Sequence, residues 1–120
     1  MSLEECYEVC GGDLAAVRGR LLDDARIAKY LGFFLQDDTY ELLGTSMAQQ
    51  DWPTAFRAAH TLKGTSMELG LLPLHSAAFA LCEALRADEA GIPKDLPAAA
   101  ELKQQVDDAY LMTQAGIALL

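Results

Sequence analysis

Residues 51–70, DWPTAFRAAHTLKGTSMELG, carry the pattern that decides the fold. Asp51 is placed to cap a helix, and Pro53 falls in the first turn, where a missing N–H costs little. At about 100° per residue, the small and apolar side chains of this stretch lie at about 160° to 260° from His60 on a helical wheel. They are Ala55, Ala58, Ala59, Leu62, Ser66 and Leu69. The stretch therefore predicts an amphipathic helix that packs this face into a core and turns His60 towards solvent.

The chain before this helix is also predicted to be helical. Capping residues open two short helices, at Ser2 and at Asp13, and the glycines at 11 and 12 end the first of them. A longer helix begins at Asp23 or Asp24, and a further helical segment follows residues 37–38. The pattern leaves open whether these last two are separate helices or one long bent helix.

The chain after residue 70 continues in the same way. Pro73 suits the start of a helix, and apolar residues then recur at helical spacing as Leu74, Ala78, Leu81 and Leu85. The sequence DEAGIP at 88–93 breaks the pattern, and a last helix is expected from about Pro97 to the C-terminus.

The predicted fold class is all α, because no run of residues alternates in the manner of a strand. Four substantial helices with short loops favour an antiparallel up-and-down four-helix bundle with one or two short N-terminal helices. The length suits a single domain over residues 1–120. An irregular orthogonal α domain is the alternative.

Composition and charge exclude several classes of function. The 120 residues are 52% hydrophobic, which predicts a packed core, and the formal net charge of -9 opposes binding to nucleic acid. Apolar runs are too short to span a membrane, and the acidic N-terminus does not resemble a signal peptide, so we expect a soluble cytoplasmic protein. Three cysteines at 6, 10 and 82 lack a disulfide or zinc pattern. No metal and no cofactor are therefore expected.

The surroundings of His60 suggest a chemical role. Lys63, one turn along, can pair with negative charge that arrives at the imidazole. Gly64 costs about 1 kcal/mol relative to alanine in a helix interior, and the simplest reason for it is room beside the ring. Together these features describe a covalent carrier of an anionic group, because a neutral imidazole is a competent nucleophile near its usual pKa. The alternative is that the charged residues merely solvate a helix face.

The motif favours the first interpretation. The segment AHTLKG at 59–64, followed by LG at 69–70, resembles the signature of histidine-containing phosphotransfer (HPt) domains. The longer AFRAAHTLKG is similar to the phosphotransfer module of chemotaxis histidine kinases. The likeness extends upstream through YLGFFLQDDTYELLGTSMAQQDW and downstream to LCEALRA, or roughly residues 25 to 90.

The resemblance implies a role for each residue around the histidine. His60 would be phosphorylated on Nε2, Lys63 would steady the phosphoryl group, and Gly64 would let a receiver domain approach. Phe56 and Met67 would form the apolar part of the docking surface, with Arg57 at its rim. The implied partners are a response-regulator receiver domain, a hybrid sensor histidine kinase, or both. From its charge and hydropathy the chain is expected to bind neither nucleic acid nor a membrane, and it is expected to be a monomer.

One position departs from the family pattern. Related domains often use a Glu or Gln of the next helix to hold Nδ1 of the histidine, whereas an ungapped count from His60 places Cys82 there. Glu83 falls about 180° from the inward stripe of its helix, so it is predicted to face solvent. Cys82 thus stands as the possible second-shell residue, and the ring is expected to be held by water or by a residue that the sequence does not identify.

These residues support three possible functions to different degrees. The first is a phosphorelay intermediate that carries a phosphoryl group on His60 and has no ATP-binding or autokinase activity, since nucleotide-binding motifs are absent from the sequence. The second is a helical binding or scaffolding module that docks a receiver or kinase without phosphotransfer. An enzyme with its own small-molecule substrate has little support, because His75 is the other histidine and no nucleophile and base are suitably spaced.

Overall fold

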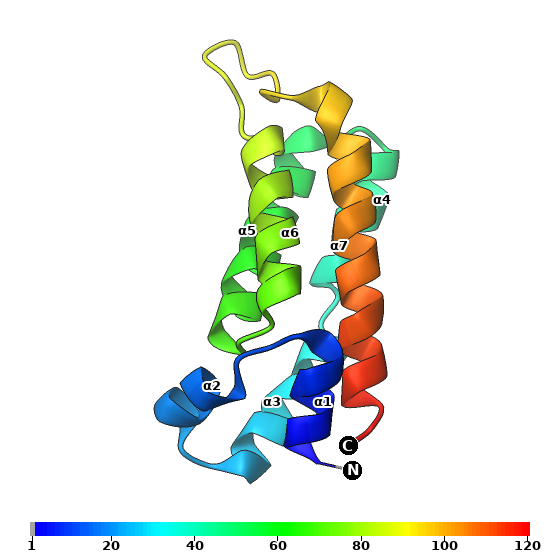
Figure 1. Cartoon of the computed structure of the whole chain (residues 1–120). Coiled ribbons are helices and arrows are strands. Elements are labelled where there is room, and N and C mark those ends of the chain that lie inside the picture. The colour runs from blue at the N-terminus through cyan, green and yellow to red at the C-terminus, as the bar shows by residue number, and fades with distance from the viewer. Residues whose placement is uncertain (1) are drawn as a thin grey trace.

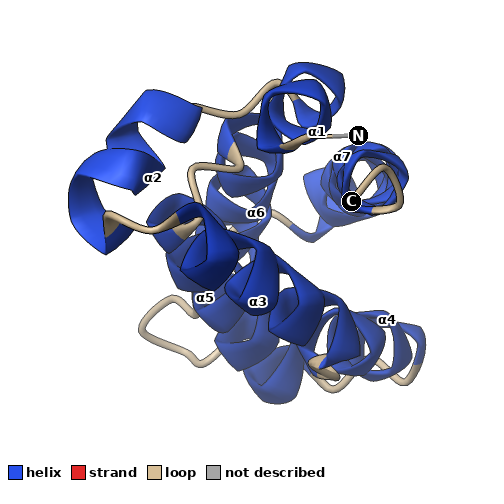
Figure 2. Ribbon diagram, turned by 90° about the horizontal axis from the view of Figure 1, so that it is seen from below, coloured by secondary structure: helices blue, strands red, loops and turns tan. Residues whose placement is uncertain are grey.

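The computed structural model describes residues 2–120, and within them helices joined by loops make up the fold (Figures 1 and 2). The helices are α1 (Leu3–Cys10), α2 (Leu14–Leu21), α3 (Asp24–Gln36), α4 (Thr39–Ala48), α5 (Trp52–Glu68), α6 (Leu72–Leu85) and α7 (Leu96–Ile117). The described residues contain no β-strand, and one isolated bridge joins Ala87 to Pro93 in the loop before α7. The prediction of an all-α fold is confirmed.

The long helices are arranged as a bundle. α5, α6 and α7 lie side by side along the long axis of the molecule (Figure 1), and α4 packs against α5 and contacts α7 through Tyr40. α1, α2 and α3 gather at one end of the bundle, and the loop between α6 and α7 lies at the other end. None of the helices in the described part of the chain is long and apolar enough to cross a lipid bilayer.

The predicted helix starts are explained by their caps. The side chains of Ser2, Asp13, Asp23, Asp51 and Asp95 each accept a hydrogen bond from a backbone N–H in the first turn of a helix. Such bonds satisfy donors that have no partner inside the helix. Prolines occupy the first turns of α5, α6 and α7, where their missing N–H removes no intrahelical bond.

The structure settles the connection between α3 and α4, which the sequence left open. Asp37 has extended backbone angles, φ −69° and ψ 139°, and its carboxylate accepts a hydrogen bond of 2.7 Å from the backbone N–H of Thr39. This local bond competes with continuation of the helix. α3 and α4 are therefore two separate helices.

The inward face of α5 is buried as predicted. Ala55, Ala59 and Ser66 have no exposed surface, and Leu62 is 1% exposed. The Ser66 hydroxyl donates to the Leu62 carbonyl at 2.6 Å, which satisfies a polar group inside the core. Small residues on this face let α5 pack closely against α4 and α6. The opposite face of α5 is therefore fixed on the outside of the bundle.

The N-terminal helices close the end of the bundle at the turn between α5 and α6. The Tyr7 hydroxyl donates to the Leu69 carbonyl at 2.7 Å, and the Asp13 N–H donates to the Gly70 carbonyl at 2.8 Å. Arg20 donates to the last carbonyls of α5, those of Met67 and Glu68. α1 and α2 thus fix the C-terminal end of the helix that carries His60.

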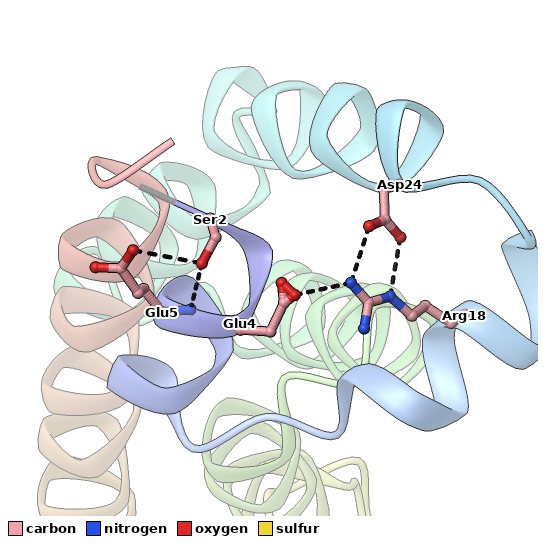
Figure 3. A network of polar contacts seen from close by, with 5 residues as sticks. All are labelled: Ser2, Glu4, Glu5, Arg18 and Asp24. Carbon is pink, nitrogen blue, oxygen red and sulfur yellow. Dashed lines mark hydrogen bonds and ion pairs between the residues drawn. The ribbon is translucent and has the colours of Figure 1, made fainter.

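Exposed polar contacts join the three N-terminal helices (Figure 3). Arg18 of α2 forms ion pairs with Glu4 of α1 and Asp24 of α3, at 2.9 and 2.8 Å. Ser2 accepts from the N–H of Glu5 and donates to its carboxylate, which confirms the predicted cap. Because these groups are exposed, the pairs orient the helices more than they stabilise the fold.

Candidate functional site

His60 lies in the middle of α5 on its solvent-exposed side, so the predicted outward orientation is confirmed. Its ring lies against the ring of Phe56, one turn earlier, with centroids 6.2 Å apart and planes tilted by 44°. Within residues 2–120, no hydrogen bond to the imidazole ring of His60 is formed. The ring is therefore oriented by α5 and Phe56, and it is open to approach from outside the chain.

Lys63 places a positive charge one turn from His60, on the side that faces α6. Its Nζ lies 5.3 Å from the ring centroid of Phe79, at a distance that suits a cation–π contact. Nδ1 of His75 lies 2.9 Å from the Lys63 carbonyl oxygen. Since a carbonyl can only accept, Nδ1 of His75 must carry the proton. α6 therefore fixes both the backbone and the side chain of Lys63.

Gly64 leaves space that the chain itself does not fill. A Cβ built on Gly64 would have no atom within 4 Å outside its own helix backbone and chain neighbours. Its backbone does not adopt the left-handed conformation that favours glycine, because the residues with positive φ lie elsewhere in the described chain. Neither packing nor backbone geometry within residues 2–120 requires a glycine here. The open space next to His60 is available to a partner.

The other predicted docking residues share this side of α5. Met67 is 51% exposed, Phe56 is half-buried, and Arg57 is exposed with its guanidinium donating to the Thr54 hydroxyl at 3.3 Å. The structure thus places an apolar side chain on each side of His60 along the helix. An exposed methionine beside a polar site is typical of a partner-binding surface.

Cys82, the possible second-shell residue, is completely buried in α6. Burial raises the pKa of its thiol, and the nearby charges of Lys63 and Arg86 oppose this shift. Cys82 therefore lies close to the cationic residues of the site as a neutral thiol. Glu83 is half-buried, and its carboxylate accepts hydrogen bonds from Arg86 at 3.0 and 3.3 Å. Within residues 2–120, neither residue is hydrogen-bonded to the His60 ring.

Sequence reasoning missed the contribution of α6. Phe79 is 49% exposed beside Lys63, and the Arg86 guanidinium lies over the ring of Phe56, 5.1 Å from its centroid. The signal was present as a helical spacing on α6. The residues at that spacing are His75, Phe79, Glu83 and Arg86. The site therefore extends across α5 and α6.

An apolar groove lies near the C-terminal end of α5, between this helix and helices α2 and α3. The sequence did not predict it. It encloses about 450 Å³. Its walls include Tyr30 and Phe33, which are 39% and 51% exposed.

Among the described residues, no cluster of three or more His, Cys, Asp or Glu side chains could hold a metal ion.

Comparison with known proteins identifies the family. A search of curated proteins and a search of solved structures found no match to this chain. The family model described as "Hpt domain" matches residues 30–110, which include α4, α5, α6 and most of α3 and α7. Hpt domains are phosphotransfer carriers rather than kinases, and they act in two-component phosphorelays with response-regulator receivers and kinases. The chain belongs to the Hpt domain family.

Proposed function

We propose that His60 carries a phosphoryl group between the aspartates of response-regulator receiver domains, or between a hybrid sensor histidine kinase and its response regulator. The observation that carries this proposal is the exposed imidazole of His60 beside Lys63 and the open space at Gly64. These features lie within the part of the chain that matches the family model. Lys63 and Gly64 act as the residues that support the phosphoryl group and make room for its donor.

The proposed reaction needs a positioned nucleophile and little else from this chain. Nε2 of neutral His60 attacks the phosphorus of a receiver's aspartyl phosphate, so that a P–N bond forms as the P–O bond breaks. The electron pair of the broken bond leaves with the aspartate carboxylate. The proton on Nδ1 stays on the ring, which is cationic until that proton is lost to water. Transfer to a receiver aspartate is the reverse of this reaction.

Lys63 is suited to the charge that develops in this reaction. A phosphoryl group adds a charge of about −1.5 to −2 and three acceptor oxygens near pH 7. Lys63 supplies a cation. His75 hydrogen-bonds to the backbone carbonyl of Lys63, and the Lys63 ammonium lies over the ring of Phe79. A charge that is placed before the reaction needs little reorganisation during it.

The surface around His60 supports docking of a receiver domain. Phe56 and Met67 provide apolar contacts, Arg57 lies at the rim, and the groove at Tyr30 and Phe33 adds apolar surface from α3. Contacts of this kind at the centre of an interface contribute most of the binding energy. We infer that the receiver covers the site on α5 and α6 around His60 and extends from there to the α3 side of the bundle.

We further infer the context in which the chain acts. α4, α5, α6 and α7 follow one another along the chain, and each packs against the next, which supports an antiparallel up-and-down four-helix bundle. Residues 1–120 are proposed to form one domain, of which residue 1 lies outside the described part. The chain is proposed to act in the cytoplasm as a monomer that lacks autokinase activity.

A second candidate function is a binding module that docks a receiver or kinase without phosphotransfer. The observation in its favour is that the His60 ring has no hydrogen-bonding partner within residues 2–120 to hold its tautomer. Such a module would use the same docking surface as the phosphorelay intermediate. The two functions differ only in whether His60 reacts.

The two functions are separated by mixing the protein with a panel of phosphorylated receiver domains. The phosphorelay proposal predicts a label on the protein that is labile in acid and stable in base, and it predicts that His60→Gln takes up no label. His75→Gln is the matched control, and it should keep the label. A protein that binds a receiver and takes up no phosphoryl group from it would instead be a docking module.

A further inference from the structure

Arg86 lies at the end of α6. Its side chain contacts Phe56 beside His60, and its backbone contacts the loop that leads to α7. It is the C-cap residue of α6, and its backbone groups pair with Glu83 and Lys94. Its guanidinium lies 5.1 Å from the centroid of the Phe56 ring, and this ring lies 6.2 Å from the centroid of His60. Phe56 thus contacts both the cation and the imidazole.

Glu83 holds the Arg86 guanidinium in this position. Nη2 and Nε of Arg86 donate to the two carboxylate oxygens of Glu83, at 3.0 and 3.3 Å. The side chains of the pair are 41% and 42% exposed. Exposed pairs of this kind are weak, because water competes for both partners. A stronger anion nearby can therefore replace Glu83.

A phosphoryl group on His60 would be such an anion. It carries about twice the charge of a carboxylate and offers three oxygens, and arginine binds phosphate through two parallel hydrogen bonds. Glu83 is held by Arg86 beside the same Phe56 ring that contacts His60, so phosphorylation brings a second anion to the surroundings of Arg86. Repulsion between the two anions then weakens the hold of Glu83 on Arg86.

We propose that Arg86 binds the phosphoryl group when His60 is phosphorylated. In the free protein, Glu83 keeps the guanidinium of Arg86 over the ring of Phe56, and on phosphorylation the guanidinium moves from Glu83 to the phosphoryl group. This inference rests on the proposed function of His60. Lys63 of α5, which lies over Phe79, and Arg86 at the end of α6, which lies over Phe56, then approach the phosphoryl group from two different helices.

The test uses the full chain phosphorylated by phosphoramidate, a small donor that requires no partner. ³¹P NMR gives the pKa of the phosphoryl group on His60, and ¹⁵N NMR follows the Nε–H signal of Arg86. A neighbouring cation favours the dianion, so Arg86→Gln should raise the pKa of the phosphoryl group by about 0.5 to 1, which is a three- to tenfold change in the ionisation constant. Arg86→Lys should restore part of this effect.

Lys94→Gln is the matched control. It removes one positive charge that also acts on Glu83, but Lys94 makes no described contact with Phe56. Its effect on the pKa of the phosphoryl group should be less than half that of Arg86→Gln. Equal effects would show that Arg86 acts only through general charge and would overturn the proposal.

The Nε–H signal of Arg86 tests the exchange of partners directly. It should move when the wild-type protein is phosphorylated. In Glu83→Gln it should already differ before phosphorylation and should then reach the wild-type phosphorylated position. A signal that does not respond to phosphorylation contradicts the proposal, as does phosphorylation of Glu83→Gln to a different end state.

The outcomes separate this inference from the proposed function. If wild type accepts no phosphoryl group from phosphoramidate or from phosphorylated receivers, both fail. If wild type is phosphorylated on His60 and Arg86→Gln behaves like Lys94→Gln, the role of Arg86 fails and the phosphorelay proposal stands. Thermal unfolding of each variant verifies that the fold is kept, because Arg86→Gln removes an exposed ion pair and should change stability little.

Discussion

Replacement of Gly64 separates the requirements of the fold from those of the partner. A Cβ at this position meets no atom of the chain within 4 Å beyond its own helix backbone and chain neighbours, and the backbone is helical. Gly64→Ala should therefore recover the helix propensity that glycine lacks, about 0.8 to 1 kcal/mol of unfolding free energy. For a domain of this size, that corresponds to an increase in Tm of about 2 to 6 °C. Gly64→Gln should also stabilise the fold.

Phosphotransfer should respond in the opposite direction. A glutamine side chain extends into the space beside His60, and a displacement of about 1 Å in the reacting geometry can lower a rate about a hundredfold. We expect Gly64→Gln to lower the rate of transfer from a phosphorylated receiver by about ten- to a hundredfold, whereas Gly64→Ala should stay within about threefold of wild type. The assays are thermal unfolding followed by circular dichroism and rapid-quench transfer kinetics.

Gly32 provides the control, because a Cβ there also meets no atom within 4 Å beyond its own helix backbone and chain neighbours, and it lies within α3. Gly32→Ala should stabilise the fold by a similar amount. Destabilisation by Gly64→Ala would refute the structural basis of the prediction, because it would reveal a packing requirement for glycine. Wild-type transfer kinetics in Gly64→Gln would refute the idea that a partner uses this space.

Three further predictions concern the stability and reactivity of the fold. Tyr7→Phe removes the buried hydrogen bond to the Leu69 carbonyl and should cost about 1 to 2 kcal/mol in urea unfolding, and a loss below about 0.3 kcal/mol would contradict it. Hydrogen bonds from Thr54 lower the pKa of the Asp51 carboxyl in the folded protein. The ionised carboxylate therefore contributes stability above the ordinary pKa of an aspartate, and this contribution is lost as the pH falls through the lower pKa of the folded state. Asp51→Asn should flatten that part of a Tm-against-pH profile, and an unchanged profile would exclude Asp51 as its source. Burial raises the pKa of the Cys6 thiol to about 11, so a thiol reagent should label the cysteines only on unfolding, and fast labelling of the native protein would contradict their burial.

The sequence was informative where structure depends on neighbours along the chain. The face of α5 and the outward direction of His60 follow from a helical period that a single segment contains. The caps at Ser2, Asp13 and Asp51 follow from residue types within one turn of the helix start. These features were predicted correctly because local geometry determines them.

Contacts between helices were not predictable in the same way. The position of Arg86 over Phe56 depends on how α5 and α6 are aligned, which a single helical wheel does not contain. The bond from Tyr7 to Leu69 joins residues 62 positions apart, so no local pattern indicates it. The groove at Tyr30 and Phe33 likewise forms only after α2, α3 and α5 have packed together.

The break between α3 and α4 is an intermediate case. Asp37 and Asp38 indicated the place where the helical pattern changes, but a bent helix and two helices share the same spacing of apolar residues. The hydrogen bond from the Thr39 N–H to the Asp37 carboxylate decides between them. Such a bond depends on one side-chain rotamer, which sequence periodicity does not specify.

The position of the phosphoryl group after reaction with a phosphorylated receiver tests the central claim most directly. Mass spectrometry of the chain under neutral conditions, combined with ³¹P NMR, identifies the residue and the ring nitrogen that carry the group. The account predicts one phosphoryl group on Nε2 of His60, and its return to a receiver aspartate when unphosphorylated receiver is added. A phosphoryl group on His75, or a chain that binds phosphorylated receivers without ever carrying the group, would contradict it.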